Sequence, residues 1–240
     1  MNLVIDVGNS QYKVCVFNDS QLEFHAQYEK LNSTVLLNLV NEYKLKRGIF
    51  SDTRGIEITE LSKLLPSEFH LMELTHNTPI PIKINYLTPH TLGKDRIAGA
   101  VAANEVFYDY PILVVDVGTA ITIDFISSKG VFEGGIISPG PELRYKSLHQ
   151  FTGKLPLCKP VEEVASIGNS TETAIESGVQ NGILYEINGY IARYIEQYPP
   201  LKIVLTGGYS YLFDKKIKYP IFADSFLIPK GLNRILKYNE

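Results

Sequence analysis

Hydrophobic and polar positions repeat one pattern at two places in the chain. Residues 113–125, LVVDVGTAITIDF, are apolar up to Asp116, turn at Val117-Gly118-Thr119, and then alternate apolar and polar positions. Residues 3–17, LVIDVGNSQYKVCVF, show the same pattern around Asp6, 110 positions earlier. Each copy predicts a strand, a tight glycine turn and a second strand paired with the first. We interpret the pair as a structural duplication, two halves of related topology, although two short strings can also agree by chance.

The remaining pattern of the first half predicts further strands and helices. Between residues 75 and 89 three prolines favour an extended or irregular segment, the longest loop predicted in the chain. Residues 93–107, GKDRIAGAVAANEVF, are rich in small side chains and predict a closely packed helix with Asp95 and Arg96 in its first turn. The other predicted elements are strands over 21–28 and 48–51 and helices over 34–43 and 59–65.

In the second half, isoleucine or valine recurs every four residues over 171–198, which predicts the clearest helix of the chain, with Asn169 or Ser170 as its N-cap. Residues 134–141, GGIISPGP, contain too much glycine and proline to be regular throughout. The other predicted elements are a strand over 131–137, a helix over 143–151, a loop over 155–160, a strand over 202–205 that ends in Thr206-Gly207-Gly208, and a last helix over 230–238.

Composition restricts the class of protein. The 240 residues are 45% hydrophobic and 20% charged, as in an ordinary globular protein. A net charge of −3 and a pI near 6.0 argue against a nucleic-acid partner. We find no apolar run that predicts a membrane span and no signal peptide. Cys15 and Cys158 are far apart and predict free thiols, so we expect a cytoplasmic protein. The five histidines show no metal-ligand spacing.

Taken together and in order, the motifs resemble those of one known family, the type III pantothenate kinases of the acetate and sugar kinase, Hsp70 and actin superfamily. The resemblance runs nearly end to end. Lys94 departs from it, because the family pattern has a small residue there. The matching segments are residues 6–13 (DVGNSQYK), Tyr86 with Pro89 and residues 92–96 (LGKDR), residues 116–119 (DVGT) with Thr122 and Asp124, Gly134-Gly135, Pro139-Gly140, Leu155-Pro156, residues 171–178, and Thr206-Gly207-Gly208.

The resemblance implies an α/β fold of two RNase H-like (actin-like ATPase) domains with a nucleotide cleft between them. We predict an N-terminal domain over residues 1–110, which carries the first phosphate turn and the substrate segment. The predicted C-terminal domain, residues 111–240, carries the second phosphate turn and the adenosine turn. Long helix 171–198 is the one candidate for the interface of the implied homodimer, although burial in a core explains its apolar positions equally well.

The first turn can be read as nothing more than a polar strand end. As a functional site it presents backbone N–H groups and short polar side chains to phosphate oxygens. Asp6 would repel phosphate, so we expect it to hold Mg²⁺ or a water of that ion. Lys13 adds a positive charge if its strand faces the nucleotide. The predicted ATP-binding residues here are Asp6, Val7, Gly8, Asn9, Ser10, Gln11, Tyr12 and Lys13.

The second turn has the same simple alternative. The resemblance implies that Thr119 contacts ATP and that Asp116 helps to bind a monovalent cation, K⁺ or ammonium; the spacing itself does not distinguish K⁺ from Mg²⁺. Gly207 and Gly208 are weaker candidates for the adenosine side, where a glycine pair lets the nucleoside approach the backbone.

Asp95 and Arg96 can be a solvated ion pair in a first helical turn, or they can be the reaction centre. In the functional reading Asp95 is the base that accepts the proton of the attacking hydroxyl. Arg96 suits the pantothenate carboxylate through a bidentate contact. The other predicted substrate residues are Tyr86, Gly93, Lys94 and Thr171, of which Thr171 can also be a simple helix cap.

These expectations define an ATP-dependent kinase that phosphorylates the 4′-hydroxyl of pantothenate, the first step of coenzyme A biosynthesis, by direct in-line transfer. One rival is another small-molecule kinase of the same superfamily, which would keep both phosphate turns without needing Tyr86 and the GKDR segment. The other rival is a nucleotide-binding regulator without catalysis, which the presence of Asp95 disfavours.

Overall fold

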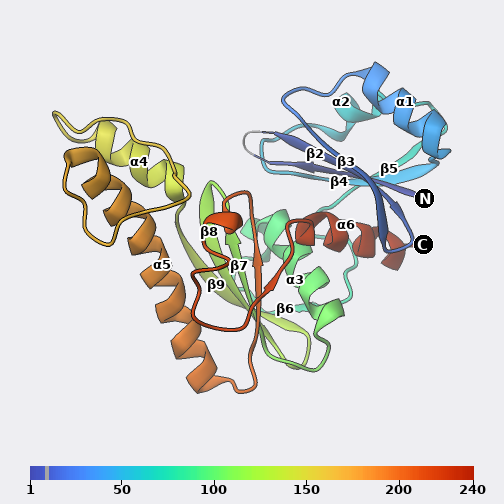
Figure 1. The fold of residues 1–240 in the computed structure, drawn as a ribbon. Helices are drawn as coiled ribbons and strands as arrows, with labels where there is room; N and C mark the ends of the chain where they lie inside the picture. The colour runs from blue at the N-terminus through green and yellow to red at the C-terminus, as the bar shows by residue number, and fades with distance from the viewer. Residues whose placement is uncertain (9–10) are drawn as a thin grey trace. The chain divides into compact units, whose positions relative to one another are not determined.

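The computed structural model describes residues 1–8 and 11–240 and divides them into two compact units. The first unit contains Met1–Val106 together with Phe226–Glu240, and the second contains Phe107–Ser225. Elements of the first unit are β1 (Asn2–Val7), β2 (Tyr12–Asn18), β3 (Gln21–Tyr28), α1 (Ser33–Tyr43), β4 (Arg47–Asp52), α2 (Ile58–Ser62), β5 (His70–Glu73), β6 (Lys83–Ile84), the 3₁₀ turn η1 (Pro89–Thr91), α3 (Lys94–Val106) and α6 (Leu227–Tyr238) (Figure 1).

The second unit repeats the same plan of three strands followed by helices and further strands. Its elements are β7 (Ile112–Val117), β8 (Ala120–Ser127), β9 (Val131–Pro139), α4 (Pro141–Gln150), α5 (Thr171–Gln197), β10 (Lys202–Thr206), the 3₁₀ turn η2 (Ser210–Leu212) and β11 (Phe222–Ala223).

The two units share one sheet topology. In the first unit the strand order is β3-β2-β1-β4-β5, with β1 antiparallel to β2 and parallel to β4. Strands of the second unit follow the order β9-β8-β7-β10-β11, with β7 antiparallel to β8 and parallel to β10. Each strand of one series therefore has a counterpart in the other, which confirms the predicted duplication of topology.

Alternation along β1 gives the first sheet two buried faces. Leu3, Ile5 and Val7 face a core that includes Leu36 and Leu39 of α1. The side chains between them point to the opposite face, where Asn2 Nδ2 donates to Asn233 Oδ1 of α6 at 2.8 Å. Helices α1 and α6 therefore cover opposite faces of this sheet, and all six residues of β1 are buried.

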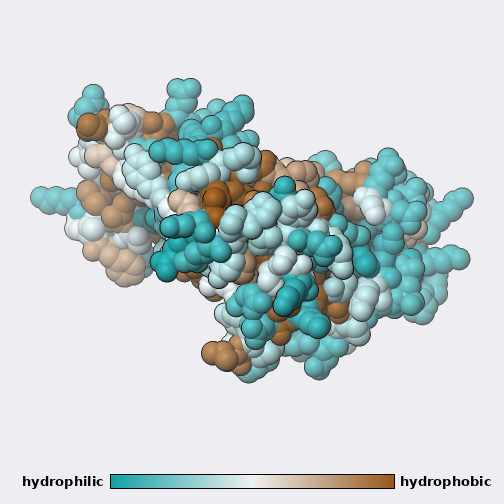
Figure 2. Space-filling view, turned by 90° about the horizontal axis from the view of Figure 1, so that it is seen from below, coloured by the Kyte–Doolittle hydropathy of each residue, from teal (hydrophilic) through white to brown (hydrophobic). Residues whose placement is uncertain are grey.

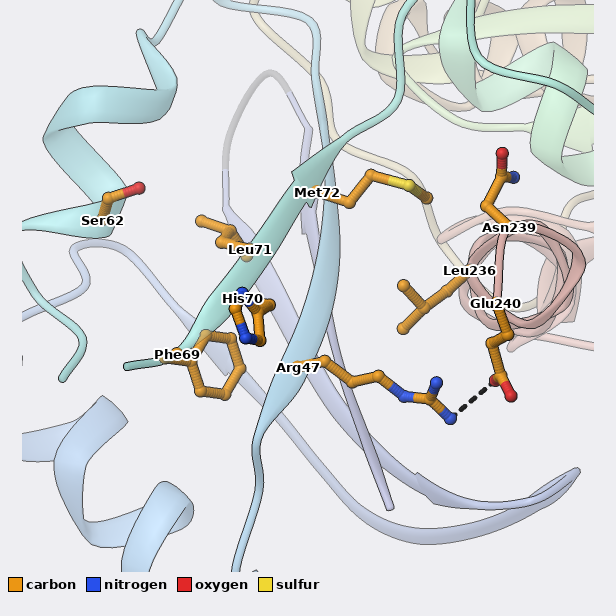
Figure 3. Close-up of a pocket in the computed structure, with 9 residues that line it drawn as sticks. All are labelled: Arg47, Ser62, Phe69, His70, Leu71, Met72, Leu236, Asn239 and Glu240. Carbon is orange, nitrogen blue, oxygen red and sulfur yellow. Dashed lines mark ion pairs between the residues drawn. The ribbon is translucent and has the colours of Figure 1, made fainter. Parts of the chain in front are cut away.

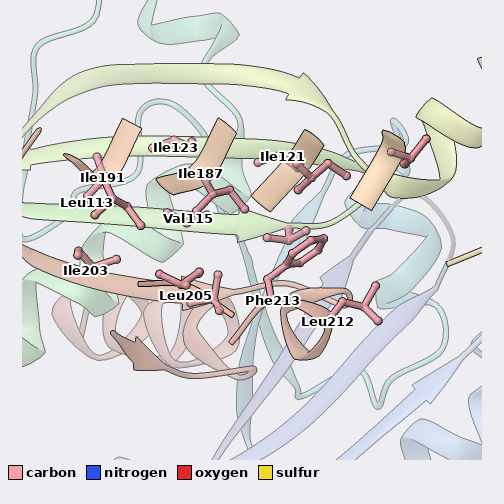
Figure 4. Close-up of a cluster of buried hydrophobic side chains, with 14 of the residues drawn as sticks. Leu113, Val115, Ile121, Ile123, Ile187, Ile191, Ile203, Leu205, Leu212 and Phe213 are labelled. Carbon is pink, nitrogen blue, oxygen red and sulfur yellow. The ribbon is translucent and has the colours of Figure 1, made fainter. Parts of the chain in front are cut away.

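In the second unit, α5 covers one face of the sheet. Its isoleucines recur every four residues, so one stripe of the helix meets Leu113, Val115, Ile121 and Ile123 on β7 and β8 (Figure 4). The predicted helix is confirmed, and Ser170 is its N-cap: the Ser170 hydroxyl accepts from the amide of Thr173 at 3.2 Å, and the Thr173 hydroxyl accepts from the amide of Ser170 at 3.0 Å.

Some predicted elements have other bounds in the structure. The strand predicted over 131–137 extends to Pro139 as β9, and it is not regular throughout, because Gly134 takes a φ of 126° and the β8–β9 register shifts beside it. Helix α2 ends at Ser62, before the predicted residue 65. The last helix begins at Leu227 rather than near residue 230, with Pro229 in its first turn, where no intrahelical N–H bond is lost.

Helix α6 also changes how the chain divides. Although it ends the sequence, it packs on α3 and β1, and the Cα of Gly231 lies so close to Ala98 that a Cβ there would be 1.8 Å from the Ala98 carbonyl oxygen. The last residues therefore belong to the first compact unit, whereas the predicted division placed them in the C-terminal domain.

Three general features complete the description. Both cysteines are free and buried, as the sequence predicts. Of the helices in the described residues, none is long and apolar enough to cross a membrane. Figure 2 shows one face of the molecule, on which hydrophilic residues surround scattered small hydrophobic patches.

Candidate active site

The first glycine turn follows a fully buried strand. Asp6, one residue before the end of β1, is 5% exposed and lies between Lys13 on β2 and Ser51 on β4. Ser51 Oγ donates to Asp6 Oδ1 at 2.9 Å. After Val7, the amide of Gly8 donates to the carbonyl of Gln11 at 3.1 Å and closes the turn. Asn9 and Ser10, two of the predicted ATP contacts, lie outside the described residues.

Burial sets the electrostatics of Asp6. Loss of water raises the pKa of its carboxyl group, and the negative charge of Asp95 raises it further. The positive charge of Lys13 and the hydrogen bond from Ser51 oppose this rise without reversing it. Asp95, in the same compact unit, is thus near enough to affect the pKa of the Asp6 carboxyl group.

The loop after β4 supports this turn, and sequence reasoning did not identify it. Thr53 donates to the Val7 carbonyl through its amide at 3.2 Å and through its hydroxyl at 2.9 Å. Asp52 accepts from the amides of Arg54, Gly55 and Ile56, which folds the loop back on itself. The guanidinium of Arg54 lies over the ring of Tyr12, 4.4 Å from its centroid. A short strand of ordinary composition gives no signal of such a role.

The predicted base stands at the start of α3. Asp95 is half-buried in the first helical turn, and its Oδ1 accepts from the amide of Arg96 at 2.8 Å. A Cβ on Gly93 would lie 2.4 Å from that oxygen, so a larger residue at position 93 would displace the Asp95 carboxylate. Arg96 is 7% exposed, and its guanidinium lies 5.8 Å from the ring centroid of Tyr86. The structure thus brings Tyr86, Gly93, Asp95 and Arg96 together.

Lys94 points its ammonium group elsewhere. Its Nζ forms an ion pair with Glu73 Oε1 at 2.9 Å, at the end of β5. The prediction that Lys94 binds substrate stays a prediction, but the charge of this side chain is directed at Glu73.

In the second turn, Asp116 has strand partners at the positions equivalent to those of Asp6 in the first turn. Asp116 on β7 lies between Thr122 on β8 and Thr206 on β10. The amide of Gly118 donates to the Ala120 carbonyl at 3.0 Å, and Thr119 is exposed at the tip. A threonine hydroxyl at an exposed turn can donate to a phosphate oxygen.

Two glycine segments pack tightly on this turn. Gly207 has a φ of 102°, and a Cβ there would lie 2.4 Å from Asp116 Oδ1. Gly140, which sequence reasoning quoted only as part of a motif, donates its amide to the Thr119 carbonyl at 3.0 Å, and a Cβ there would lie 2.2 Å from the Gly118 carbonyl oxygen. Gly208 is exposed, and nothing lies within 4 Å of a Cβ built on it. Gly207 therefore supports Asp116, while Gly208 leaves its backbone open to a ligand.

Thr171 is the first residue of α5 and is exposed. Because Ser170 caps the helix, the alternative that Thr171 is merely the cap is wrong. Its hydroxyl stands at a helix N-terminus, where an anionic group is favoured; a contact with substrate stays a prediction.

Two of the cavities among the described residues, of about 400 and 620 Å³, lie away from these turns. The smaller one is lined by Arg47, His70, Met72 and Leu236, at the edge where β4 begins, whereas Asp6 lies near the end of β1 (Figure 3). Its Arg47 already pairs with Glu240 at 2.6 Å and with Asn2. In the second unit, the larger cavity contains Phe125 and Tyr198 and lies at the start of β7. Neither cavity contains a predicted site residue.

The residues fit a kinase-type magnesium site rather than a protein-built metal centre. Within residues 1–8 and 11–240, no three His, Cys, Asp or Glu side chains gather closely enough to hold a metal ion. Mg²⁺ in phosphoryl-transfer enzymes is held by one or two carboxylates together with substrate phosphates and water. Asp6 supplies a carboxylate of that kind.

Comparison with solved structures places the fold. A protein from Campylobacter jejuni named as a Baf family transcriptional activator matches 99% of this chain and 98% of its own with a TM-score of 0.63 at 24% identity. A 2-dehydro-3-deoxygalactonokinase from Sinorhizobium meliloti matches 100% of this chain and 99% of its own with a TM-score of 0.58 at 11% identity. Two equivalent sheets, each with an aspartate before a glycine turn, define the fold of the actin-like kinases, and this chain has it.

Sequence comparison is more specific. The family model for type III pantothenate kinase matches residues 2–193. A type III pantothenate kinase from Phocaeicola vulgatus is 45% identical over 100% of this chain and 99% of its own length. Another, from Cytophaga hutchinsonii, is 45% identical over the full length of both chains. This chain belongs to the type III pantothenate kinase family, as its motifs predict.

Proposed function

We propose that this protein transfers the γ-phosphoryl group of ATP to the 4′-hydroxyl of pantothenate, the first step of coenzyme A biosynthesis. One observation carries the proposal: the carboxylate of Asp95, the candidate base, accepts from the amide of Arg96, and the buried guanidinium of Arg96 lies near the ring of Tyr86. Family membership supplies the substrate class, and the first turn of α3 supplies a carboxylate and a guanidinium side by side.

We assign phosphate contacts to each of the two glycine turns. In the first turn, Gly8 has no Cβ, and Lys13 is the adjacent positive charge. Thr119 donates its exposed hydroxyl from the second turn, and Gly208 leaves the backbone open for the adenosine. Phosphoryl transfer requires positioning and charge stabilisation more than covalent chemistry, so two rigid turns suit it.

Two cations complete the ATP site. Asp6 holds Mg²⁺ or its water, and the ion offsets the negative charge of the phosphates. Asp116, half-buried between two threonines, is the ligand we assign to the monovalent cation, K⁺ or ammonium. This assignment rests on membership of the family, because the residues at this turn do not themselves distinguish K⁺ from Mg²⁺.

Asp95 accepts the proton of the pantothenate hydroxyl, and Arg96 binds the pantothenate carboxylate. One oxygen of Asp95 is held by the Arg96 amide, which fixes the direction of the carboxylate. Burial of Arg96 strengthens its attraction for an anion, since water screens it less. Tyr86, near the guanidinium, and the backbone of Gly93 are the other substrate contacts that we assign in the first unit, and Thr171 of α5 is the one that we assign in the second. The hydroxyl attacks the γ-phosphorus directly, with no covalent enzyme intermediate.

The protein acts as a homodimer in the cytoplasm. Exposed Tyr185 of α5 lies outside the buried stripe of isoleucines, on a helix long enough to present a second face to a partner copy. Light scattering of the purified protein tests this: a mass near 54 kDa, twice the 26.9 kDa of one chain, is expected, and a mass of one chain contradicts it.

The substrate assignment is tested with purified protein, ATP, Mg²⁺ and K⁺, and mass spectrometry of the product. Phosphopantothenate is expected with pantothenate and no product with simple sugars or acetate. A product from a sugar or acetate alone would support the rival kinase of the same superfamily, and ATP binding without any product would support a regulator. Omission of K⁺ and ammonium is expected to reduce the rate while Mg²⁺ is held constant.

A further inference from the structure

Glu73 lies at the same edge of the first sheet as the phosphate turn. Strands β1, β4 and β5 are parallel, and Glu73 is the last residue of β5, opposite Phe50 of β4. The following residue, Leu74, is fully buried and donates its amide to the Phe50 carbonyl at 2.9 Å. Glu73 therefore stands on a firmly held strand end, one strand beyond Ser51, which binds Asp6.

The ion pair of Glu73 with Lys94 is partly shielded from water. The two side chains are 28% and 18% exposed, and the Nζ–Oε1 distance is 2.9 Å. Near the C-terminal end of α3, the helix that begins with Lys94, Glu105 forms an ion pair with Arg234 of α6 at 3.1 Å. The side chains of Arg234 and Glu105 are 32% and 52% exposed. Shielding strengthens the attraction between charges, so the Glu73–Lys94 pair constrains its partners more than the Arg234–Glu105 pair does.

The body and the first turn of α3 are fixed by different contacts. From Arg96 to Asn104 the helix is buried, and it packs closely on α6 where Gly231 meets Ala98. Gly93, Lys94 and Asp95 are only half-buried, so packing constrains them less. The ion pair connects this first turn to the end of β5.

We propose that Glu73 is a positioning residue for phosphoryl transfer: through Lys94 it fixes Asp95 and Arg96 at the edge of the sheet that carries Asp6. Neither Glu73 nor the ammonium of Lys94 touches the reacting atoms in this account. The inference rests on the proposed role of Asp95 as base, and small errors in the placement of such a group are costly to the rate.

The test uses four variants: Glu73→Gln, Lys94→Met, the double variant that combines them, and the reversed pair Glu73→Lys with Lys94→Glu. For each, kcat, the KM values for pantothenate and for ATP, and the melting temperature are measured. Each single variant is expected to lower kcat by about tenfold with little change in KM for ATP. The double variant is expected to be no worse than either single one, and the reversed pair to recover most of the loss. Glu105→Gln, at the far end of the same helix, is the matched control and keeps the wild-type kcat.

Three results would overturn the inference. Loss of activity in Lys94→Met alone, with Glu73→Gln like wild type, would make Lys94 a direct substrate ligand. Lower melting temperatures with unchanged kcat in both single variants would make the pair merely structural. If Glu105→Gln lowered kcat as much as Glu73→Gln does, the effect would not be specific to the Glu73–Lys94 ion pair. Asp95→Asn is run alongside: if it stays active, the role of the base is contradicted, whereas an inactive Asp95→Asn with a wild-type Glu73→Gln contradicts the positioning role alone.

Discussion

The two glycine turns occupy equivalent places in equivalent sheets, yet they are built differently. Asp6 has Lys13 and Ser51 as its neighbours on the flanking strands, whereas Asp116 has two threonines there. Asp6 is buried and Asp116 half-buried. The first turn, from Val7 to its partner Tyr12, is also one residue longer than the second, from Val117 to Ile121.

What supports each turn differs as well. Side chains hold the first turn, through the hydroxyls of Ser51 and Thr53. Close backbone packing holds the second, at Gly140 and Gly207. The two turns therefore differ in their roles. The first turn has charged groups around it, and the second is a backbone frame held by close packing.

Asp6→Asn is expected to lower kcat/KM at least about a hundredfold, because the carboxylate to which we assign Mg²⁺ is lost. The same variant is expected to melt at a higher temperature than wild type at pH 7. Burial raises the pKa of Asp6, so the folded protein holds its proton more tightly than the unfolded chain, and the ionised form costs stability.

The sign of the pH effect provides the check. As pH falls through the raised pKa toward the ordinary value of 3.8, wild-type Asp6 is protonated and its penalty disappears. The difference in melting temperature between Asp6→Asn and wild type should therefore shrink from pH 7 to pH 4 in a calorimetric series. A variant that melts lower than wild type throughout would show that the ionised carboxylate stabilises the fold.

Gly207→Ala is expected to destabilise the protein by about 3 kcal/mol, because a Cβ would clash with backbone at a position of positive φ. Urea denaturation measures it. Gly8→Ala is the matched variant in the first turn, where, among the described residues, a Cβ would meet only the Gln11 carbonyl oxygen at an ordinary 3.6 Å, and we expect a change below about 1 kcal/mol. Equal losses at the two glycines would contradict the division between a side-chain turn and a backbone turn.

Ser51→Ala removes the hydrogen bond to Asp6 and is expected to cost about 1 kcal/mol of stability at neutral pH. Because that hydrogen bond lowers the pKa of Asp6, its loss raises the pKa further, and the acid limb of the kcat/KM profile should move to higher pH. Thr53→Ala is the control. It removes the hydroxyl hydrogen bond to the Val7 carbonyl, but the backbone amide of residue 53 still donates to that carbonyl, so the acid limb of the profile should stay in place. An acid limb unmoved in Ser51→Ala would mean that Asp6 does not set it.

The candidate site residues that sequence reasoning selected lie in single motifs. Asp6, Asp116 and Asp95 stand near glycines at strand or helix ends, and it was the order of these motifs and the family resemblance that selected them. Sequence reasoning did not identify Ser51, because its hydrogen bond to Asp6 depends on the parallel pairing of β1 with β4. Hydrophobic periodicity contains no information about the register of that pairing. Glu73 escaped for the same reason, since only the fold brings the end of β5 to the start of α3.

The fold, like the site, was predictable where it depends on local sequence pattern. A repeated strand–turn–strand pattern predicts two related sheets, and the structure has them. The place of α6 was not predictable, because an amphipathic helix at the end of a chain does not indicate which sheet it covers. Its position depends on the close approach of Gly231 to Ala98, a contact between residues 133 positions apart.

The most direct test of the central claim separates chemistry from nucleotide binding in Asp95→Asn. The asparagine keeps the oxygen that accepts from the Arg96 amide, so the first turn of α3 should stay folded. We predict that kcat falls by about a thousandfold, within the usual range for loss of a general base, while the affinity for ATP, measured by calorimetry, changes less than about twofold. A kcat near that of wild type, or a loss of ATP affinity that matches the loss of kcat, would contradict Asp95 as the base.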